Sequence, residues 1–448
     1  MWVQDRIQPY QHNPFYWQYK GQPVLLLGGS VEDNLFQIPD IEAQLDVLHA
    51  VGGNYVRCTL SSRDEGDVWP FERDPITGLY DLNQPGVEYW RKFEYFLELC
   101  AARDIIVQIE VWDRFDFARA PWQLNPFNPK NNSNYTAAES GLLLDINTHP
   151  GLKENAFFRS VPALDNNTVL LPYQHIHVDR LLSIALEYGN VLYCMDNETN
   201  ESPEWGAYWA RYIQQQAGEA GLPVHCTEMW DAWNILDDEH LATIVHPELY
   251  TFIDGSQNNH NSADAHWDNL HELCRRVRAS GHIRPMNSVK IYGANTGRYG
   301  TNRDGQERFW RNVLGGLAAA RFHRPPAGLG LSEIAQAHLR SMRMLTQEVD
   351  VFACEAHNDL LQNRSGNEAH CMAQPGREYV VFFPDGGNVL LDVSDAKGSL
   401  NVRWLDIRQS QWLDADKISV EVLDMKNYAR LVTPAEDGFW AALIQVKQ

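Results

Sequence analysis

The stretch that decides the fold is Asn190-Val-Leu-Tyr-Cys-Met-Asp-Asn-Glu198. An apolar run with high β-propensity stops abruptly and is followed by polar side chains. This order is typical of a buried parallel strand that carries polar groups at its C-terminal end. In a (β/α)8 barrel, the C-terminal ends of the strands form the face where catalytic groups gather. We therefore expect Glu198 to lie at the mouth of such a barrel.

Strand-like and helix-like segments alternate on both sides of this stretch, from about residue 15 to residue 348. The expected barrel strands are 24–27, 54–60, 105–111, 191–195, 224–227, 249–253, 287–292 and 321–323. Each is followed by a helical segment or a short remnant of one, and this alternation produces a parallel sheet. The sequence predicts an α/β fold with a (β/α)8 TIM barrel over residues 1–350.

One connection of the expected barrel is unusually long. Residues 114–171 contain many Asn and Pro residues and show little periodicity. Long loops inside a compact domain are usually functional. We expect this segment to lie over the mouth of the barrel.

The pattern changes beyond residue 351. Short apolar runs are separated by the turn sequences Pro-Asp-Gly-Gly and Asp-Ala-Lys-Gly, and they lie at 379–383, 389–393, 400–404 and 439–446. Short strands joined by such turns are typical of antiparallel sheets. Residues 351–448 are predicted to form a small antiparallel β-sandwich domain.

Charge and composition restrict the expected partners. The net charge of −22 argues against binding to nucleic acid or to an anionic membrane, because both require basic patches. No apolar run approaches the roughly 20 residues that span a membrane. The N-terminus lacks a basic start followed by an apolar stretch, so no secretory signal is expected and a cytoplasmic location is predicted. Neither the oligomeric state nor a protein partner follows from these properties.

Cysteine and histidine spacing gives no sign of a metal site. The seven cysteines are an odd number, are widely spread and include no CxxC pair, so neither a disulfide framework nor a zinc site is expected. The histidines show no ligand spacing typical of zinc. We expect the protein to need no metal and no other cofactor.

Short motifs along the chain point to a family. They include Phe15-Tyr-Trp-Gln-Tyr-Lys-Gly-Gln-Pro-Val-Leu-Leu-Leu-Gly28, Val51-Gly-Gly-Asn-Tyr-Val-Arg57 and Trp404-Leu-Asp-Ile-Arg408. With them, the chain resembles the apiosidase-like glycoside hydrolases, which are barrels followed by a β-domain described as collagen-binding. An Asn-Glu pair at the tip of the fourth strand, here Asn197-Glu198, resembles the acid/base signature of the large glycosidase clan to which such barrels belong. The resemblance implies that Glu198 is the proton donor.

The chain departs from this family pattern in two places. The family usually has Gly-Asp-Thr after the first strand, whereas this chain has Gly28-Gly29-Ser30. Clan members carry a nucleophilic Glu at the tip of strand seven, where this chain has Lys290. A lysine cannot replace a carboxylate that attacks an anomeric carbon, so the usual retaining mechanism is in question.

Glycoside hydrolysis generally needs two carboxyl groups beside the scissile bond. We predict Glu198 as the general acid, with its pKa raised by burial and by neighbouring carboxylates such as Asp196. Glu228, after the fifth expected strand, is the preferred second carboxylate, as base or nucleophile, because Trp230 beside it would provide a stacking surface. Asp254, after the sixth strand, is the alternative, and Asp113 is a third candidate.

Several side chains near these carboxylates are predicted to bind substrate. Asn197 would bond a sugar hydroxyl, and Trp230 would provide a stacking surface. Arg57, Arg63 and Lys290 could form a basic floor for a uronate or sulfate group, although counter-ions to the carboxylates are the alternative interpretation. The full set of expected substrate-binding residues is Asn197, Trp112, Asp113, Arg57, Trp230, Lys290 and Tyr292.

The leading functional hypothesis is a glycoside hydrolase that cleaves an O-glycosidic bond in an oligo- or polysaccharide. A barrel that binds glycans without hydrolysing them is a second hypothesis, favoured by Lys290 at the position of the expected carboxylate. A polysaccharide lyase, with Lys290 or Tyr292 removing a proton beside a uronate, is a third. All three hypotheses predict a carbohydrate ligand.

Overall fold

The computed structural model describes residues 3–297, 299–414, 420–423 and 425–447. Its central feature is a sheet of eight parallel strands in the order β10-β9-β8-β5-β4-β13-β12-β11. These strands are β4 (Leu26–Gly29), β5 (Tyr55–Thr59), β8 (Ile106–Asp113), β9 (Val191–Asn197), β10 (Cys226–Thr227), β11 (Ile253–Asp254), β12 (Met286–Ile291) and β13 (Ala319–Phe322). Each overlaps an expected strand, so the predicted barrel is confirmed.

The two ends of this sheet, β10 and β11, approach each other. The Thr251 N–H donates to the Cys226 carbonyl at 2.9 Å, and the Thr227 hydroxyl donates to the Phe252 carbonyl at 2.8 Å. These bonds join β10 to the two residues that precede β11. The sheet is therefore a nearly closed barrel.

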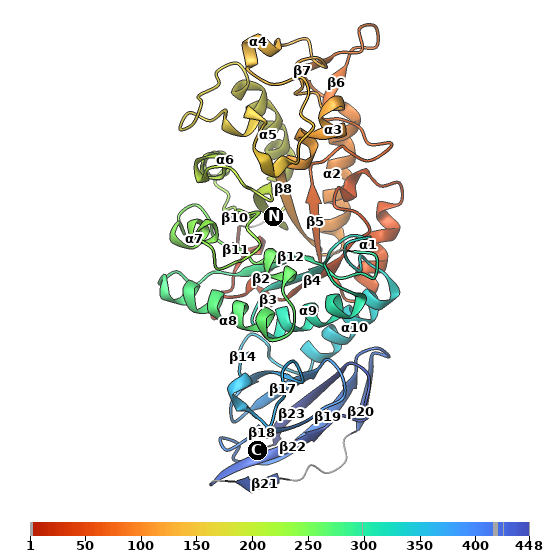
Figure 1. The fold of residues 1–448 in the computed structure, drawn as a ribbon, viewed down its shortest axis with the longest axis vertical. Helices are drawn as coiled ribbons and strands as arrows, with labels where there is room; N and C mark the ends of the chain where they lie inside the picture. The colour runs from red at the N-terminus through yellow and green to blue at the C-terminus, as the bar shows by residue number, and fades with distance from the viewer. Residues whose placement is uncertain (1–2, 298, 415–419, 424, 448) are drawn as a thin grey trace.

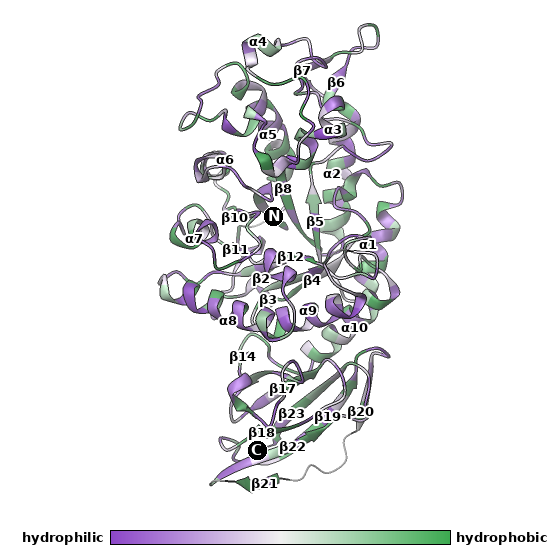
Figure 2. Cartoon of the chain, in the orientation of Figure 1, coloured by the Kyte–Doolittle hydropathy of each residue, from purple (hydrophilic) through white to green (hydrophobic). Residues whose placement is uncertain are grey.

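Helices surround the barrel on its outer side (Figure 1). The larger ones are α1 (Ile41–Ala50), α2 (Val87–Ala102), α5 (Leu171–Ala185), α6 (Pro203–Glu219), α7 (Asp238–Val245), α8 (Ala263–Ala279), α9 (Asn302–Leu314) and α10 (Glu333–Thr346). Helix α9 begins with a capping box, in which Thr301 and Asp304 bond each other's backbone N–H groups. In Figure 2 the barrel strands are mostly apolar, whereas the surrounding helices mix polar and apolar residues, as expected of amphipathic helices.

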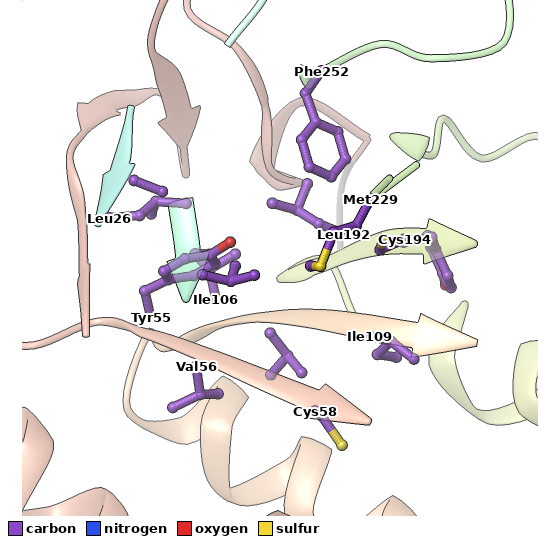
Figure 3. Close-up of a cluster of buried hydrophobic side chains, with 14 of the residues drawn as sticks. Leu26, Tyr55, Val56, Cys58, Ile106, Ile109, Leu192, Cys194, Met229 and Phe252 are labelled. Atoms are coloured by element: carbon purple, nitrogen blue, oxygen red, sulfur yellow. The ribbon is translucent and has the colours of Figure 1, made fainter. Parts of the chain in front are cut away.

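The barrel strands are covered on both faces, which explains their continuous apolar runs. Figure 3 shows side chains from neighbouring strands, such as Leu26, Ile106 and Leu192, gathered in this core. At the N-terminal end of the barrel, Trp17 of β2 (Trp17–Tyr19) is fully buried and donates to Asn287 at 2.9 Å. Strand β2 forms a small antiparallel sheet with β1 (Gln8–Pro9) and β3 (Gln22–Val24).

The long connection 114–171 is more structured than its sequence suggests. It contains η3 (Arg114–Phe117), α3 (Arg119–Leu124), α4 (Ala137–Ser140), η4 (Pro150–Leu152) and η5 (Ala156–Arg159). Buried asparagines stabilise it through bonds to its own backbone; Asn128, for example, donates to the carbonyls of Trp122 and Leu144. The Asn-rich composition therefore reflects side-chain bonding to turns and loops.

The C-terminal part consists of two antiparallel sheets, which confirms the predicted β-domain. One sheet contains β14 (Glu355–Ala356), β16 (His370–Gln374), β17 (Glu378–Phe383), β23 (Trp440–Lys447), β19 (Ser399–Asp406) and β20 (Gln411–Asp414). The other contains β15 (Leu361–Gln362), β18 (Asn388–Asp392), β22 (Lys426–Val432) and β21 (Val420–Leu423). A hydrophobic cluster distinct from that of the barrel fills this domain.

The β-domain packs on the α9 and α10 side of the barrel (Figure 1). Trp310 of α9 stacks on Phe382 with ring centroids 5.2 Å apart, and Ser341 of α10 donates to the Ile407 carbonyl at 2.8 Å. None of the residues that line the cavity at the barrel mouth, within the described ranges, comes from this domain. No helix in the described part of the chain is long and apolar enough to cross a membrane.

Candidate active site

A cavity of about 700 Å³ opens at the C-terminal ends of the barrel strands. Its lining includes Asp33, Arg57, Asn197, Glu198, Asp231, Trp233, His260, Lys290, Tyr292, His323 and Arg324. The connection 114–171 adds one wall, formed by Phe115, Ala118, Arg119, Pro121, His149 and Pro150. The cavity occupies the end of the barrel where this fold places its active sites.

Glu198 lies at the tip of β9 and is the central carboxylate of the cavity. The Lys290 ammonium donates to Glu198 Oε1 at 2.6 Å, and the Tyr292 hydroxyl donates to the same oxygen at 3.4 Å. The backbone of Glu198 has a φ of +62°, a left-handed conformation that costs a residue with a side chain about 1–2 kcal/mol. Such strain at a cavity-lining carboxylate is typical of a functional position.

The pKa of Glu198 is shifted in the opposite direction to our expectation. Burial is the largest single influence and would raise this pKa, but the charge and hydrogen bond of Lys290, together with the charge of Arg57, outweigh it, and the pKa is lowered. Asp196, which we expected to raise it, instead pairs with Arg114 at 2.7 Å. The prediction of a raised pKa was wrong because it did not include the cation that strand seven places beside Glu198.

Lys290 is held in a chain of charged and polar groups. It donates to Asn197 Oδ1 at 2.6 Å, and Asn197 in turn donates to Asp113 at 2.9 Å. Asp113 pairs with Arg63 at 2.5 Å. Lys290 is only 2% exposed, so its position is set by these partners. At strand seven, the cavity therefore has a fixed cation that holds Glu198 ionised.

The other predicted cations of the cavity also have carboxylate partners. Arg57 pairs with Asp33 at 2.7 Å and with Glu110, which it contacts through two nitrogen atoms. These contacts agree with the interpretation of the cations as counter-ions. Arg119 also lines the cavity and, by contrast, forms no ion pair with any residue that the structure describes.

Glu228 lies outside the cavity lining. It is 1% exposed and accepts a bond from the Thr199 hydroxyl at 2.5 Å. Its other oxygen faces α6, where a Cβ on Gly206 would come within 1.8 Å of it. Burial raises the pKa of Glu228 to about 8. The side chain occupies the space between barrel and helix that the glycine leaves open.

Asp254 and the two predicted tryptophans are also absent from the cavity lining. Asp254 accepts bonds from the Ser256 N–H and hydroxyl, both at 2.9 Å, and burial raises its pKa to about 7. Trp112 packs against Trp209 of α6 at 5.4 Å between ring centroids. Trp230 is 2% exposed and donates to Thr243 of α7 at 2.8 Å. The two tryptophans therefore pack against the outer helices, and Asp254 bonds to the loop that follows its own strand.

Asp231 and Trp233 are among the cavity residues that the sequence analysis did not predict. Asp231 lies three residues beyond Glu228, is half-buried and has a pKa raised by burial and by Glu198. Trp233, 57% exposed, stacks on His260 with ring centroids 4.8 Å apart and an interplanar angle of 11°. Both belong to the segment Thr227-Glu-Met-Trp-Asp-Ala-Trp233. From this segment, the sequence predicted only Glu228 and Trp230 as site residues.

The residues described by the structure contain no group of three or more His, Cys, Asp or Glu side chains that could hold a metal ion. Carboxyl groups with and without ion pairs line the cavity beside aromatic rings, and such groups can act as general acids and bases.

No protein-family model and no curated protein sequence matches the chain. Solved structures do match it. A glycoside hydrolase family 5 protein from Bacteroides vulgatus superposes with a TM-score of 0.65 and 12% identity, covering 99% of this chain and 93% of that one. A second glycoside hydrolase gives 0.64 and 11%, with coverage of 99% and 97%. The endo-1,4-β-mannanase of Rhizomucor miehei gives 0.51 and 13%, with coverage of 78% and 99%.

At these identities the likeness is one of fold. The first two matches extend over the barrel and the β-domain together, so this chain shares the two-part architecture of those glycoside hydrolases. The finer resemblance to apiosidase-like enzymes stays a prediction.

Proposed function

We propose that the protein is a glycoside hydrolase and that the cavity at the barrel mouth is its active site. Glu198 is the carboxylate on which the proposal depends. The observation that carries it is the placement of Glu198 at the tip of β9, in a strained backbone conformation and bonded to Lys290, within an open cavity. The shared fold with glycoside hydrolases supports the same conclusion.

The substrate is an oligo- or polysaccharide with an O-glycosidic bond. Trp233 and His260 present a stacked aromatic surface on the cavity wall, and sugar rings pack their C–H faces against such surfaces. Asn197 lines the cavity beside Glu198 and remains the predicted partner of a sugar hydroxyl.

Two observations favour hydrolysis over the rival functions. A second carboxyl group without an ion pair, that of Asp231, lines the same cavity as Glu198, whereas a purely binding site has no need of such a pair. The Lys290 ammonium donates to Glu198 and Asn197, and the Tyr292 hydroxyl donates to Glu198, so both groups are poorly placed to take a proton as the base of a lyase.

The test is a comparison of wild type and Glu198→Gln on a panel of plant and algal oligosaccharides. We expect the variant to lose at least about 10³-fold in kcat/KM, because loss of a catalytic carboxylate removes the interaction made in the transition state. Glu204→Gln is the matched control, since Glu204 is exposed and only six residues away. Full activity of Glu198→Gln on a substrate that the wild type cleaves would refute the proposal. An unsaturated product absorbing in the ultraviolet would indicate a lyase.

A further inference from the structure

We propose that Asp231 is the proton donor of this reaction and that Glu198 is its ionised partner, which activates the attacking water. This inference rests on the proposed function and reverses the role that the family resemblance implies for Glu198. It starts from the position of Asp231, whose carboxyl group lines the cavity and makes no hydrogen bond or ion pair with another residue in the described ranges.

The backbone holds Asp231 beside Glu198. A parallel bridge pairs Thr199 with Trp230 beyond the regular strands. The Thr199 N–H donates to the Met229 carbonyl at 2.7 Å, and the Asp231 N–H donates to the Thr199 carbonyl at 2.8 Å. Glu198 precedes one member of this bridge and Asp231 follows the other. The backbones at Glu198 and Asp231 are therefore held on neighbouring segments by consecutive hydrogen bonds, and both side chains line the same cavity.

The surroundings of the two carboxyl groups differ in a way that separates their roles. Glu198 accepts a bond from Lys290, which stabilises its charged form. Asp231 has no direct cationic partner, and burial together with the charge of Glu198 raises its pKa. Lys290, His149 and Arg114 are near enough to oppose this rise in the pKa of Asp231, but they do not cancel it. Two carboxyl groups whose environments shift their pKa values apart are suited to act as base and acid.

The other carboxylates near the cavity are unsuited to donate a proton. Asp33 contacts Arg57, Arg321 and Arg324, and these cations hold its pKa well below the usual range despite its burial. Asp113 is bonded to Arg63 and Asn197. Asp231 is the lining carboxyl group, among the described residues, that combines an open position with a raised pKa.

A single displacement follows from these roles, because the base acts on a water molecule and not on the sugar. The inference therefore predicts that Glu198 and Asp231 hold their carboxyl groups at the spacing of inverting glycosidases. Inverting glycosidases hold their two carboxyl groups about 6.5–9.5 Å apart, which leaves room for a water molecule.

In the proposed step, the Asp231 proton passes to the glycosidic oxygen. The bond between this oxygen and the anomeric carbon breaks, and its electron pair stays on the oxygen. A water molecule attacks the anomeric carbon from the opposite face while Glu198 takes one of its protons. The products are an alcohol and a sugar of inverted configuration, and proton exchange with solvent restores both carboxyl groups.

The experiment compares Asp231→Asn with wild type on a natural oligosaccharide and on the 2,4-dinitrophenyl glycoside of the same sugar. Dinitrophenolate leaves without protonation. We therefore expect the variant to lose about 10²–10⁴-fold in kcat/KM on the natural substrate and less than about tenfold on the dinitrophenyl glycoside. Its pH profile should also lose the basic limb. Glu198→Gln should fail on both substrates. Asp238→Asn, at an exposed position in the same region, is the control.

Two outcomes would overturn the inference. One is an Asp231→Asn variant within threefold of wild type on the natural substrate while Glu198→Gln is inactive, since the proposed function would then stand without Asp231. The other is a first-formed product of retained configuration in an NMR time course. If Glu198→Gln is fully active as well, the proposed function itself fails.

A second readout requires no substrate and covers the case in which Asp231→Asn folds poorly. In protein labelled with 13C at its aspartate carboxyl groups, we assign the Asp231 resonance with Asp231→Asn or Asp231→Ser. It should titrate above the ordinary aspartate range, and its midpoint should fall in Glu198→Gln, because a neighbouring negative charge is removed. Titration of Asp231 within or below the ordinary range would contradict the inference.

Discussion

The ends of β9 and β10 each carry two carboxyl groups, one buried and one in the cavity. Asp196 and Glu198 are two residues apart along the chain, and Glu228 and Asp231 are three residues apart. Asp196 and Glu228 are buried behind the strands, whereas Glu198 and Asp231 line the cavity. Burial raises the pKa of both buried groups. In the cavity pair the shifts are opposite, because Glu198 has a lysine partner and Asp231 has none. Carboxyl groups from the same short stretches thus acquire different environments, according to whether they point into the cavity or away from it.

The largest effect is expected when Lys290 is removed, because this cation makes the environment of Glu198 different from that of Asp231. We expect Lys290→Met to lower kcat by about 10²–10⁴-fold, because Glu198 would lose the partner that keeps it ionised. The acid limb of the pH profile should move to higher pH, since the lowered pKa of Glu198 depends on Lys290. Lys130→Met, at an exposed position in the connection 114–171, is the control. An unchanged acid limb in Lys290→Met would show that Glu198 does not determine it.

A smaller effect is expected at the aromatic surface beside the carboxyl pair. Trp233→Ala should raise KM about two- to tenfold with little change in kcat, because a stacking ring binds the ground state and the transition state alike. Tyr95→Ala, an exposed aromatic position on α2, is the control. A change confined to kcat would show that Trp233 acts on the reacting centre.

The smallest effect on activity is expected at the buried carboxyl groups, Asp196 and Glu228. Glu228 should instead influence how the free energy of unfolding depends on pH. Glu228→Gln should keep activity within about twofold, because Glu228 does not line the cavity. The raised pKa of Glu228 means that the protein favours its protonated form. Stability from this group is therefore present below pH 4.5 and is lost as the pH rises toward about 8, by an amount on the order of a few kcal/mol. The variant should lose less stability over this range, as measured by urea unfolding. An equally steep loss in Glu228→Gln would exclude Glu228 as its source.

Much of the architecture was predictable from the sequence because it depends on local patterns. The eight barrel strands appear as short apolar runs, since both of their faces are covered. The abrupt change from Met195 to Asp196 marked the end of β9, and counting strands placed Lys290 on the seventh. The Gly- and Asp-containing turns after residue 351 indicated antiparallel strands.

The positions of individual side chains around the mouth depend on tertiary geometry. Strand β10 comprises only Cys226–Thr227, so the alternation that assigns a residue to one face is lost before Glu228. Asp231 faces the cavity because of the bridge between Thr199 and Trp230, a contact between segments that are distant in sequence. Trp112 and Trp233 show the same limit, because aromatic character alone does not distinguish core packing from a cavity wall.

The left-handed backbone of Glu198 has a consequence for laboratory selection of heat-resistant variants. Glycine adopts that conformation without steric cost, but Glu198→Gly alone would leave the Lys290 ammonium buried without its carboxylate partner. A library screened only for resistance to heat should therefore enrich variants in which Glu198 and Lys290 change together to uncharged residues. Such variants should lose the activity that we propose for the cavity.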